Sequence, residues 1–436
     1  MDPNAPNWEH GLEPAALSDI GLRRGNNQDA LATVIASSQE KFLQRGHLFL
    51  VADGMGAHAA GELASKLAAD VVPLTYYKLL DRSPPEALVA AIQDANSQIH
   101  NRGMASDDFR GMGTTVSALA ILPEGAWVSH VGDSRVYRVR ANQIEQLTFD
   151  HSLVWELRAA GHVSPEDAPS YIPKNIITRS LGPNPEVQID LEGPLPIQPG
   201  DVFLLCSDGL SGQVGDHEIG KIVSALPPEE AVRALVDLAN LRGGPDNVTV
   251  IVVRVARPPA ARGDTEPSAA PPSRRGGFPL PVALWVTAGV LALLAGGAMF
   301  YGETTAGLAC LGGAAVAGLI ALLRAHGASG EPRGFRPMGK GPYTSTDATV
   351  DGPFVEQLSQ TVGQLRDAAA GADWTIDWDR FREHESRAVA ATGRGEFAEA
   401  VRDYCRAMVF MMTELRSQPD RRKLAEGGSD SFSESF

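Results

Sequence analysis

The sequence predicts a domain of the mixed α+β class over residues 1–257, followed by an apolar helical hairpin and a helical tail. Short runs rich in β-branched and aliphatic residues indicate strands at 48–52, 127–131, 136–140, 201–206 and 248–255. Apolar residues recur three and four positions apart over 58–80 and 85–101, which is typical of helices. Because the two patterns alternate along the chain, we expect strands and helices to share one domain.

Composition excludes several classes of protein. The chain has 436 residues and a net charge of −15, whereas binding to a nucleic-acid backbone needs a basic excess, so we expect no nucleic acid partner. Cys206, Cys310 and Cys405 are too widely spaced for a zinc motif or a disulfide framework, and they indicate buried thiols in a reducing compartment. The amino terminus has no basic segment followed by an apolar core, so no signal peptide is expected.

After the first domain the composition changes twice. Residues 258–279 are rich in Pro, Ala, Gly and Ser, which predicts a linker. Residues 282–301 and 306–323 then contain no charged residue, and each run is close to the roughly 20 apolar residues that span a bilayer. We therefore predict a transmembrane helical hairpin over 280–324, with a buried hairpin in a soluble protein as the alternative.

The charges around this hairpin predict its orientation. Arg274, Arg275, Arg324 and Arg333 flank the two runs, and the turn between them carries only Glu303. Positive residues stay on the cytoplasmic side of a membrane. We therefore expect an inner-membrane protein that crosses the bilayer twice, with the first domain and the tail both in the cytoplasm.

The C-terminal part reads as a helical appendage. We predict a second linker over 325–353, a helical tail over 354–420 and a disordered end over 421–436. The helical pattern breaks at 393–395, and the stretch GRGEFAEAVRDYCRAM resembles half of a tetratricopeptide repeat. Such repeats normally stack at least three deep, so a simple two-helix appendage is the alternative.

Five aspartates lie at turns next to short apolar runs: Asp29, Asp53, Asp133, Asp208 and Asp246. Any one of them alone is a common turn residue whose side chain satisfies the backbone. Together they are hard oxygen ligands at the mouth of a sheet, which is the ligand type that Mg²⁺ and Mn²⁺ require. Because no His or Cys cluster competes for zinc, the pattern favours a site for these harder cations.

The motifs that carry these aspartates occur in a characteristic order. The chain shows SDIGLRRGNNQDA, FLVADGMGAHAAGE, GMGTTV, VGDSRVYRV, DHS at 150–152, TRSLG at 178–182, LLCSDGL and PDNVTVIVV. This series resembles that of the bacterial type 2C metal-dependent (PPM-type) serine/threonine protein phosphatases and covers residues 19–255. The resemblance implies a four-layer α-β-β-α sandwich with a metal site between its two sheets.

The resemblance also implies a role for each matching residue. Asp53 would bridge two divalent cations, Mn²⁺ or Mg²⁺, with the Gly54 carbonyl on one of them and Asp208 and Asp246 on the other. Asp29 would hold a metal-bound water, and Asp133 would bind a third, weaker cation together with Asp208. Arg24 would grip the substrate phosphate, so the expected catalytic residues are Arg24, Asp53 and Asp208. Two such cations lower the pKa of a shared water for in-line attack on phosphorus, and a guanidinium suits phosphate oxygens.

Three positions depart from the family pattern or stay open. Gln28 stands where many members have Glu, which removes one charge from a water-mediated metal contact. Ala57 replaces a glycine at a tight turn. His58 is a candidate proton donor to the leaving alcohol, although a single His beside a metal site is more often structural. The family's flap, which contributes to substrate choice, falls between His151 and Ile177.

The function expected from these observations is hydrolysis of phosphoserine and phosphothreonine by a membrane-anchored enzyme that faces the cytoplasm. Its partners would be phosphorylated proteins, including kinases and their substrates, and the membrane through residues 282–323. The alternative is a catalytically silent module that binds phosphoproteins. Every expected ligand position is occupied, whereas loss of activity usually removes an aspartate, so the enzyme is the favoured interpretation.

Overall fold

The computed structural model describes residues 11–56, 59–161, 176–257, 339–371 and 376–417. The described parts of the first domain and of the C-terminal helices belong to one compact unit. Several predictions lie outside these residues: the linker at 258–279, the hairpin at 280–324, the end at 421–436, Cys310, Ala57, His58 and most of the flap. Within the described ranges, no helix is both long enough and apolar enough to cross a bilayer.

One antiparallel sheet, here called the first sheet, contains both ends of the described domain. Its strands, in spatial order, are β1 (Leu12–Asp19), β11 (Val248–Val255), β10 (Val202–Cys206), β7 (Arg135–Arg140), β8 (Gln143–Gln146) and β12 (Thr344–Asp347). The central strands β10 and β11 are buried along almost their whole length, which explains their continuous aliphatic sequence. β1 was not predicted, because its sequence LEPAALSD contains no β-branched residue and includes Pro14, which an edge strand tolerates.

The second sheet is also antiparallel and faces the first. Its strands, in spatial order, are β2 (Asp29–Val34), β3 (His47–Met55), β5 (Val116–Leu122), β6 (Gly125–Val131) and β9 (Asp190–Leu195), and the short β4 (Gly113–Thr114) pairs with the end of β3. β3, β5 and β6 are buried almost throughout. The predicted strand at 127–131 is therefore part of a longer β6.

The first domain contains several α-helices, and two pairs of them cover the outer faces of the two sheets. The helices are α1 (Gln39–Arg45), α2 (Ala60–Lys78), α3 (Pro84–Ala105), α4 (Leu153–Ala159), α5 (Asp208–Ser211), α6 (Asp216–Ala225) and α7 (Pro228–Leu241). Local chemistry marks where α3 begins, because the Ser83 amide donates to the Glu86 carboxylate at 3.1 Å. The prolines that open α3 and α7 lack an N–H that the first helical turn would leave unpaired.

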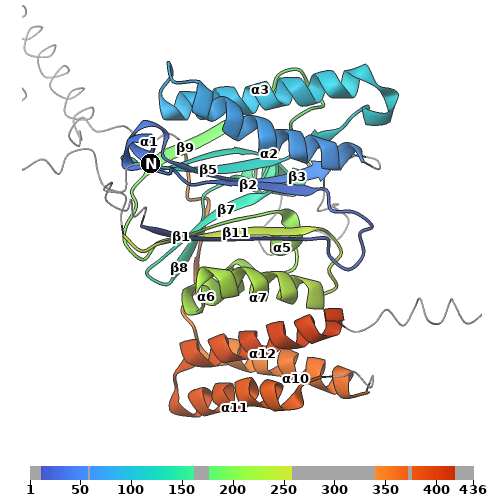
Figure 1. Ribbon diagram of the computed structural model, residues 1–436, viewed down its shortest axis with the longest axis vertical. Coiled ribbons are helices and arrows are strands. Elements are labelled where there is room, and N and C mark those ends of the chain that lie inside the picture. Colours follow the sequence, from blue (N-terminus) through green and yellow to red (C-terminus); the bar gives the residue numbers. More distant parts are fainter. Residues whose placement is uncertain (1–10, 57–58, 162–175, 258–338, 372–375, 418–436) are drawn as a thin grey trace, which may run out of the picture. The chain divides into compact units, whose positions relative to one another are not determined.

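Three apolar clusters hold the layers together. One lies between the sheets and includes Phe49, Leu119 and Phe203. A second packs α2 and α3 onto the second sheet, and a third packs α6 and α7 onto the first sheet. Figure 1 shows these layers in the order helices, sheet, sheet, helices. The predicted four-layer α-β-β-α sandwich is therefore confirmed.

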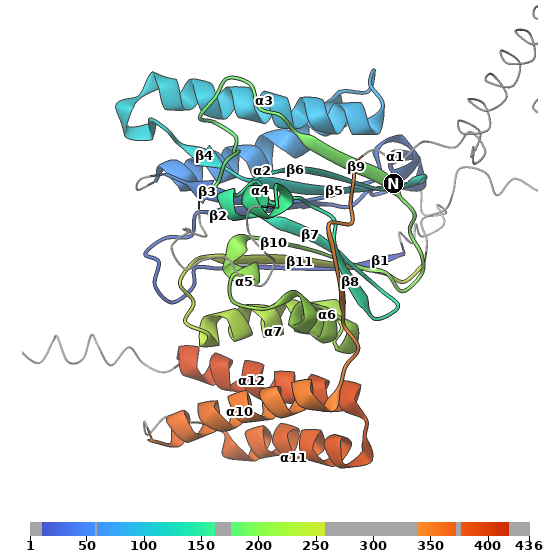
Figure 2. The ribbon, with the colours of Figure 1, turned by 180° about the vertical axis from the view of Figure 1, so that it is seen from behind.

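A fifth layer of helices packs on the outer side of α6 and α7. It consists of α10 (Gly352–Gly371), α11 (Trp378–Arg394) and α12 (Phe397–Ser417), and Figures 1 and 2 show α12 next to α7. Arg406 of α12 pairs with Glu230 of α7 at 2.8 Å, and Met408 and Met411 are fully buried in the third apolar cluster. The tail therefore extends the core of the first domain, whereas we had predicted a separate appendage.

The turn between α11 and α12 agrees with the sequence pattern. α11 ends at Arg394, and Gly395 follows in the left-handed conformation at a φ of +76°, which is a common way for a helix to stop. The predicted break at 393–395 is thus confirmed as a helix end. The structure adds α10, so the tail contains three described helices around one apolar centre.

The predicted linker at 325–353 contains ordered structure in its second half. β12 pairs with β8, with Thr344 opposite Gln146, and so adds a strand to the first sheet. Just before β12, the amides of Lys340 and Gly341 donate to the carboxylate of Glu192 on β9 of the second sheet, at 3.2 and 3.1 Å. A stretch of four residues has too short a pattern to be recognised as a strand from the sequence, since its partner is two hundred positions away.

Candidate active site

The pairing of β2 with β3 brings the first two candidate residues together. Asp29 lies directly opposite Asp53 in this register, so both carboxylates project from neighbouring positions of one face. Gly54 follows immediately, and a Cβ on it would lie 2.1 Å from the carbonyl oxygen of Gly61 and 2.5 Å from that of Gln28. The chain therefore requires glycine at this position, where the carbonyl was predicted to bind a cation.

The first sheet delivers two more aspartates to the same region. Asp208 begins α5 just after β10, and Asp246 lies just before β11. The hydroxyl of Ser207 donates to Oδ2 of Asp29 at 2.7 Å and accepts from the Thr249 amide at 3.0 Å. Ser207 thus links the two sheets beside the carboxylates, a role that sequence reasoning missed because a single serine gives no signal.

Asp133 occupies the loop between β6 and β7. Its side chain is buried, and its Oδ1 atom has no hydrogen-bond partner among the described residues. A buried carboxylate oxygen without a donor is unfavourable in the protein alone. It is consistent with the prediction that Asp133 holds a cation.

The electrostatics of the cluster favour a bound positive charge. Burial raises the pKa of Asp53 well above its usual range, and repulsion from Asp29, Asp208 and Asp133 raises it further. Burial raises the pKa of Asp29 and of Asp133 to about 7 each, with the charge of Asp208 adding to both shifts. The pKa of Asp208 is raised by burial and by Asp246. A divalent cation between these groups would offset both their desolvation and their mutual repulsion.

The described side chains are not arranged as a complete coordination sphere. No three His, Cys, Asp or Glu side chains of the described ranges are arranged to hold one ion as they stand. Two of the candidate carboxylates have protein partners instead, Asp29 with Ser207 and Asp246 with Arg24. In this structure the Oδ2 atom of Asp246, a predicted cation ligand, is therefore engaged by the Arg24 guanidinium.

Arg24 lies at the edge of this cluster. Its Nη2 donates to Oδ2 of Asp246 at 2.6 Å, and its side chain is 47% exposed. The hydrogen bond to Asp246 raises the pKa of Arg24, and the charges of Asp53 and Asp208 contribute to the same shift. The residue predicted to grip the phosphate thus lies beside the carboxylates and remains open to solvent, although the pairing with Asp246 was not predicted.

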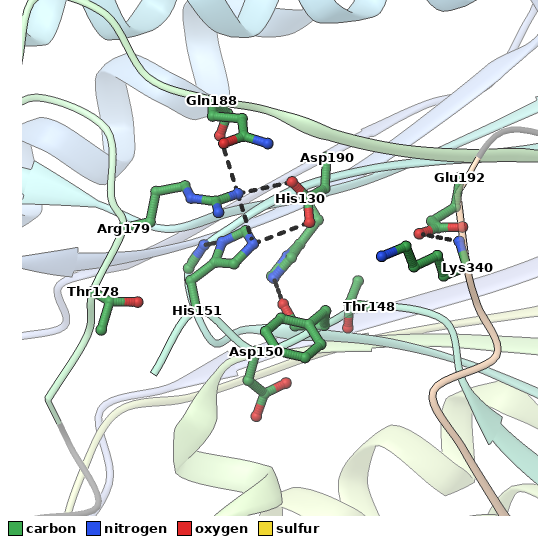
Figure 3. A network of polar contacts seen from close by, with 12 residues as sticks. His130, Thr148, Asp150, His151, Thr178, Arg179, Gln188, Asp190, Glu192 and Lys340 are labelled. Atoms are coloured by element: carbon green, nitrogen blue, oxygen red, sulfur yellow. Dashed lines mark hydrogen bonds and ion pairs between the residues drawn. The ribbon is translucent and has the colours of Figure 1, made fainter. Parts of the chain in front are cut away.

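A partly buried polar network surrounds His151, which bonds to Gly132 (Figure 3). Oδ2 of Asp190 is 3.1 Å from Nε2 of His151, and Oδ1 of the same carboxylate accepts from Arg179 at 2.7 Å. Nε2 of His130 contacts the carbonyl oxygen of Phe149 at 3.0 Å, and burial lowers the pKa of His130 to about 3, so this residue is neutral. The DHS and TRSLG motifs were noticed in the sequence, but their roles depend on contacts between distant segments.

The roles predicted for Arg24, Asp29, Asp53, Gly54, Asp133, Asp208 and Asp246 stay predictions. The structure brings the carboxylates of the set into electrostatic contact and places Gly54 and Arg24 beside them. His58, the candidate proton donor, and residues 162–175 of the flap region lie outside the described residues.

Comparisons with known proteins point to one family. A sequence profile described as protein phosphatase 2C matches residues 23–238. The protein phosphatase PhpP of Streptococcus pneumoniae is 37% identical over 246 residues, which cover 56% of this chain and 97% of the relative. The crystal structure of the Mycobacterium tuberculosis serine/threonine phosphatase PstP/Ppp is similar with a TM-score of 0.50 and 36% identity, over 56% of this chain and 99% of that one.

A further solved structure resembles the chain. It is the catalytic domain of serine threonine protein phosphatase PstP in complex with two manganese ions, at 35% identity and a TM-score of 0.47, and it covers 56% of this chain and 99% of that chain. The profile match at residues 23–238 lies within the first domain.

Proposed function

Because the chain belongs to the protein phosphatase 2C family of metal-dependent serine/threonine phosphatases, we propose that it hydrolyses phosphoserine and phosphothreonine of proteins at the carboxylate cluster around Asp53. The observation that carries the proposal is the convergence of Asp29, Asp53, Asp133 and Asp208 from both sheets, where the charges of Asp29, Asp133 and Asp208 all raise the pKa of Asp53. Such a concentration of negative charge destabilises a protein unless a positively charged ligand neutralises it. The divalent cations of a metal-dependent phosphatase would neutralise it.

Different residues of the chain would bind the cations and orient the attacking water. Two divalent cations, Mn²⁺ or Mg²⁺, are the cofactor, and when bound they activate water for attack on phosphorus. Asp53, Asp208 and Asp246, with the Gly54 carbonyl, would hold them, and Asp29 would orient the water through its carboxylate. Asp133 would hold a weaker, third cation at the edge of the site.

Arg24 would orient the phosphate. The guanidinium of Arg24 is half exposed and paired with Asp246. A phosphate that enters the site can therefore replace the Asp246 carboxylate as the partner of Arg24. The same exchange frees the Asp246 carboxylate for a cation. Substrate binding and completion of the cation site are therefore coupled through one ion pair in this proposal.

An assay on the full chain in mild detergent tests the activity. Purified protein should release phosphate from a phosphothreonine peptide in Mn²⁺ and stop in EDTA, while Asp53→Asn should be inactive yet folded, because it removes charge from the central ligand. Wild-type protein that binds the phosphopeptide without hydrolysing it in Mn²⁺ would support the silent module instead. Activity that survives both EDTA and Asp53→Asn would refute the proposed site.

We also propose that residues 282–323 anchor the enzyme to the inner membrane with both flanking parts in the cytoplasm. The uncharged runs and their flanking arginines support this. The packing of α12 on α7 supports one part of this proposal, that the segments before and after residues 282–323 lie on the same side, because they could not touch across a membrane. Phosphorylated cytoplasmic proteins, including kinases and their substrates, would then be within reach.

Reporter fusions test this topology. Fusions after Pro259 and after Phe436 should both report the cytoplasm, and a fusion at Thr304 in the predicted turn should report the opposite compartment. A C-terminal fusion that reports the outside would contradict the hairpin, and it would also be incompatible with the contacts between α12 and α7. Recovery of the full chain in the soluble fraction would refute membrane anchoring.

A further inference from the structure

The loop that carries Asp133 is held by one histidine. The amide of His151 donates to the carbonyl oxygen of Gly132 at 2.7 Å, and Nδ1 of its ring accepts from the Gly132 amide at 3.0 Å. The ring is 1% exposed. His151 therefore satisfies both backbone groups of the residue that immediately precedes Asp133.

Gly132 needs this support because its backbone is in an unusual conformation. Its φ is +116°, which is rare for any residue with a Cβ, and a Cβ here would lie 2.5 Å from the methyl carbon of Thr115. On the other side of the loop, the Thr115 hydroxyl contacts the Ser134 hydroxyl at 2.7 Å and the Asp53 amide at 2.9 Å. The path of the chain on either side of Asp133 is thus held by His151 and by Thr115.

Polar contacts hold the ring of His151 at both of its nitrogens. Because Nδ1 accepts from the Gly132 amide, a ring proton on Nε2 faces the carboxylate of Asp190 at 3.1 Å. Arg179 also donates to Asp190, and its Nη1 lies 2.9 Å from Nε2 of His151 (Figure 3). The pKa of Asp190 is lowered although burial opposes this, because the hydrogen bonds from His151 and Arg179 favour the carboxylate.

We infer that His151, oriented by Asp190 and Arg179, is a positioning residue that sets the backbone of Gly132 and thereby aims the Asp133 carboxylate into the active site. The inference deepens the proposed function, because it rests on Asp133 as a ligand of the weaker cation. The Oδ1 atom of Asp133 lacks a hydrogen-bond partner among the described residues, and its residue directly follows Gly132 in the chain. The main chain of His151 is itself fixed, since its carbonyl accepts from the Thr178 amide at 2.8 Å.

Two matched substitutions separate positioning from simple packing. The amide oxygen of asparagine in His151→Asn can lie near the position of Nδ1 and accept from Gly132. The longer His151→Gln places its amide near Nε2, so it can still contact Asp190 but leaves the buried Gly132 amide without an acceptor. A purely structural role predicts that the larger glutamine fills the site at least as well as asparagine.

The readouts are calorimetric Mn²⁺ binding, turnover of a phosphothreonine peptide and thermal unfolding in EDTA, all on the full chain in detergent. We expect His151→Gln to weaken Mn²⁺ binding at the lowest-affinity site about tenfold and to lower kcat about tenfold. In His151→Asn both quantities should stay within about threefold of wild type. The two high-affinity sites should be unchanged in both variants.

Several outcomes would overturn the inference. It fails if folded His151→Gln binds Mn²⁺ at the weak site as wild type does, or if the losses of the two variants simply follow their unfolding temperatures. If His151→Gln does not fold, Asp190→Asn decides. It removes the carboxylate that orients Nε2 of the ring, so the inference expects a looser bond from Nδ1 to the Gly132 amide and weaker binding at the low-affinity site, and unchanged weak-site binding refutes it. A wild type with no phosphatase activity would refute the proposed function alone, since the Mn²⁺ titrations would still test the role of His151.

Discussion

Replacing Asp29 by asparagine should stabilise the protein when no divalent cation is bound and weaken its response to Mn²⁺. Asp29 faces Asp53 across β2 and β3, and burial together with the charge of Asp208 raises its pKa to about 7. An asparagine at this position has no charge to desolvate. Its side-chain oxygen can still accept from the Ser207 hydroxyl, so the contact between the two sheets is retained.

The size of the effect follows from this pKa. An aspartate in an unfolded chain titrates near pH 4, so between about pH 4 and pH 7 the unfolded chain releases a proton that the folded chain retains. The free energy of unfolding of the metal-free protein therefore falls as the pH rises through this interval, by up to about 1.4 kcal/mol per pH unit for one group. The full difference would be about 4 kcal/mol, but Asp29 is partly solvated and titrates together with its neighbours, so we expect Asp29→Asn to gain about 2 kcal/mol at pH 8.

Urea unfolding of the full chain in detergent and EDTA measures this gain, at pH 8 and at pH 5, where it should be smaller. Asp379→Asn is a matched control, because that side chain is 92% exposed and should give no change beyond about 0.5 kcal/mol. Added Mn²⁺ should then stabilise wild type more than Asp29→Asn. The reasoning is refuted if Asp29→Asn is no more stable than wild type in EDTA at pH 8 and Mn²⁺ stabilises both proteins equally. That result would show that the charge of Asp29 does not destabilise the metal-free protein.

Three other perturbations test separate parts of the molecule. Asp208→Asn should abolish turnover in Mn²⁺ while the circular dichroism spectrum is unchanged, and near-normal rates would contradict its role as a ligand. Asp133→Ala should leave two Mn²⁺ ions bound by calorimetry and lower turnover on a phosphopeptide about tenfold, whereas an unchanged rate would remove Asp133 from the site. Glu192→Ala leaves the Lys340 and Gly341 amides without their acceptor, so it should lower the free energy of unfolding by about 1 to 3 kcal/mol in urea, and no loss would mean that this contact does not hold β12 in place.

Much of the secondary structure of the domain could be predicted because it is specified by residues that are close together in the sequence. The aliphatic run at 248–255 is the whole of β11, and the spacing of apolar residues over 58–80 corresponds to α2. The candidate aspartates could be found because each follows or precedes such a run and is next to a turn residue. Their order along the chain is a property of the sequence, and it identified the family before any contact was known.

The rest depends on contacts between segments that are far apart in the chain. β1 and β12 have weak strand patterns and are strands because each pairs with a strong one, β11 or β8. The helical tail has an ordinary amphipathic sequence, which specifies that it needs a partner but not that the partner is α7.

The sequence by itself determined which residues are the candidates for binding cations and phosphate, since the chemistry of each side chain and its neighbours in the motif is local. Only the tertiary structure decided how these residues meet: Asp29 opposite Asp53, Arg24 on Asp246, and His151 on the backbone of Gly132. The physical reason is that strand register and loop conformation are set by packing over the whole domain. A local pattern of residues carries no record of a partner that lies in another segment of the chain.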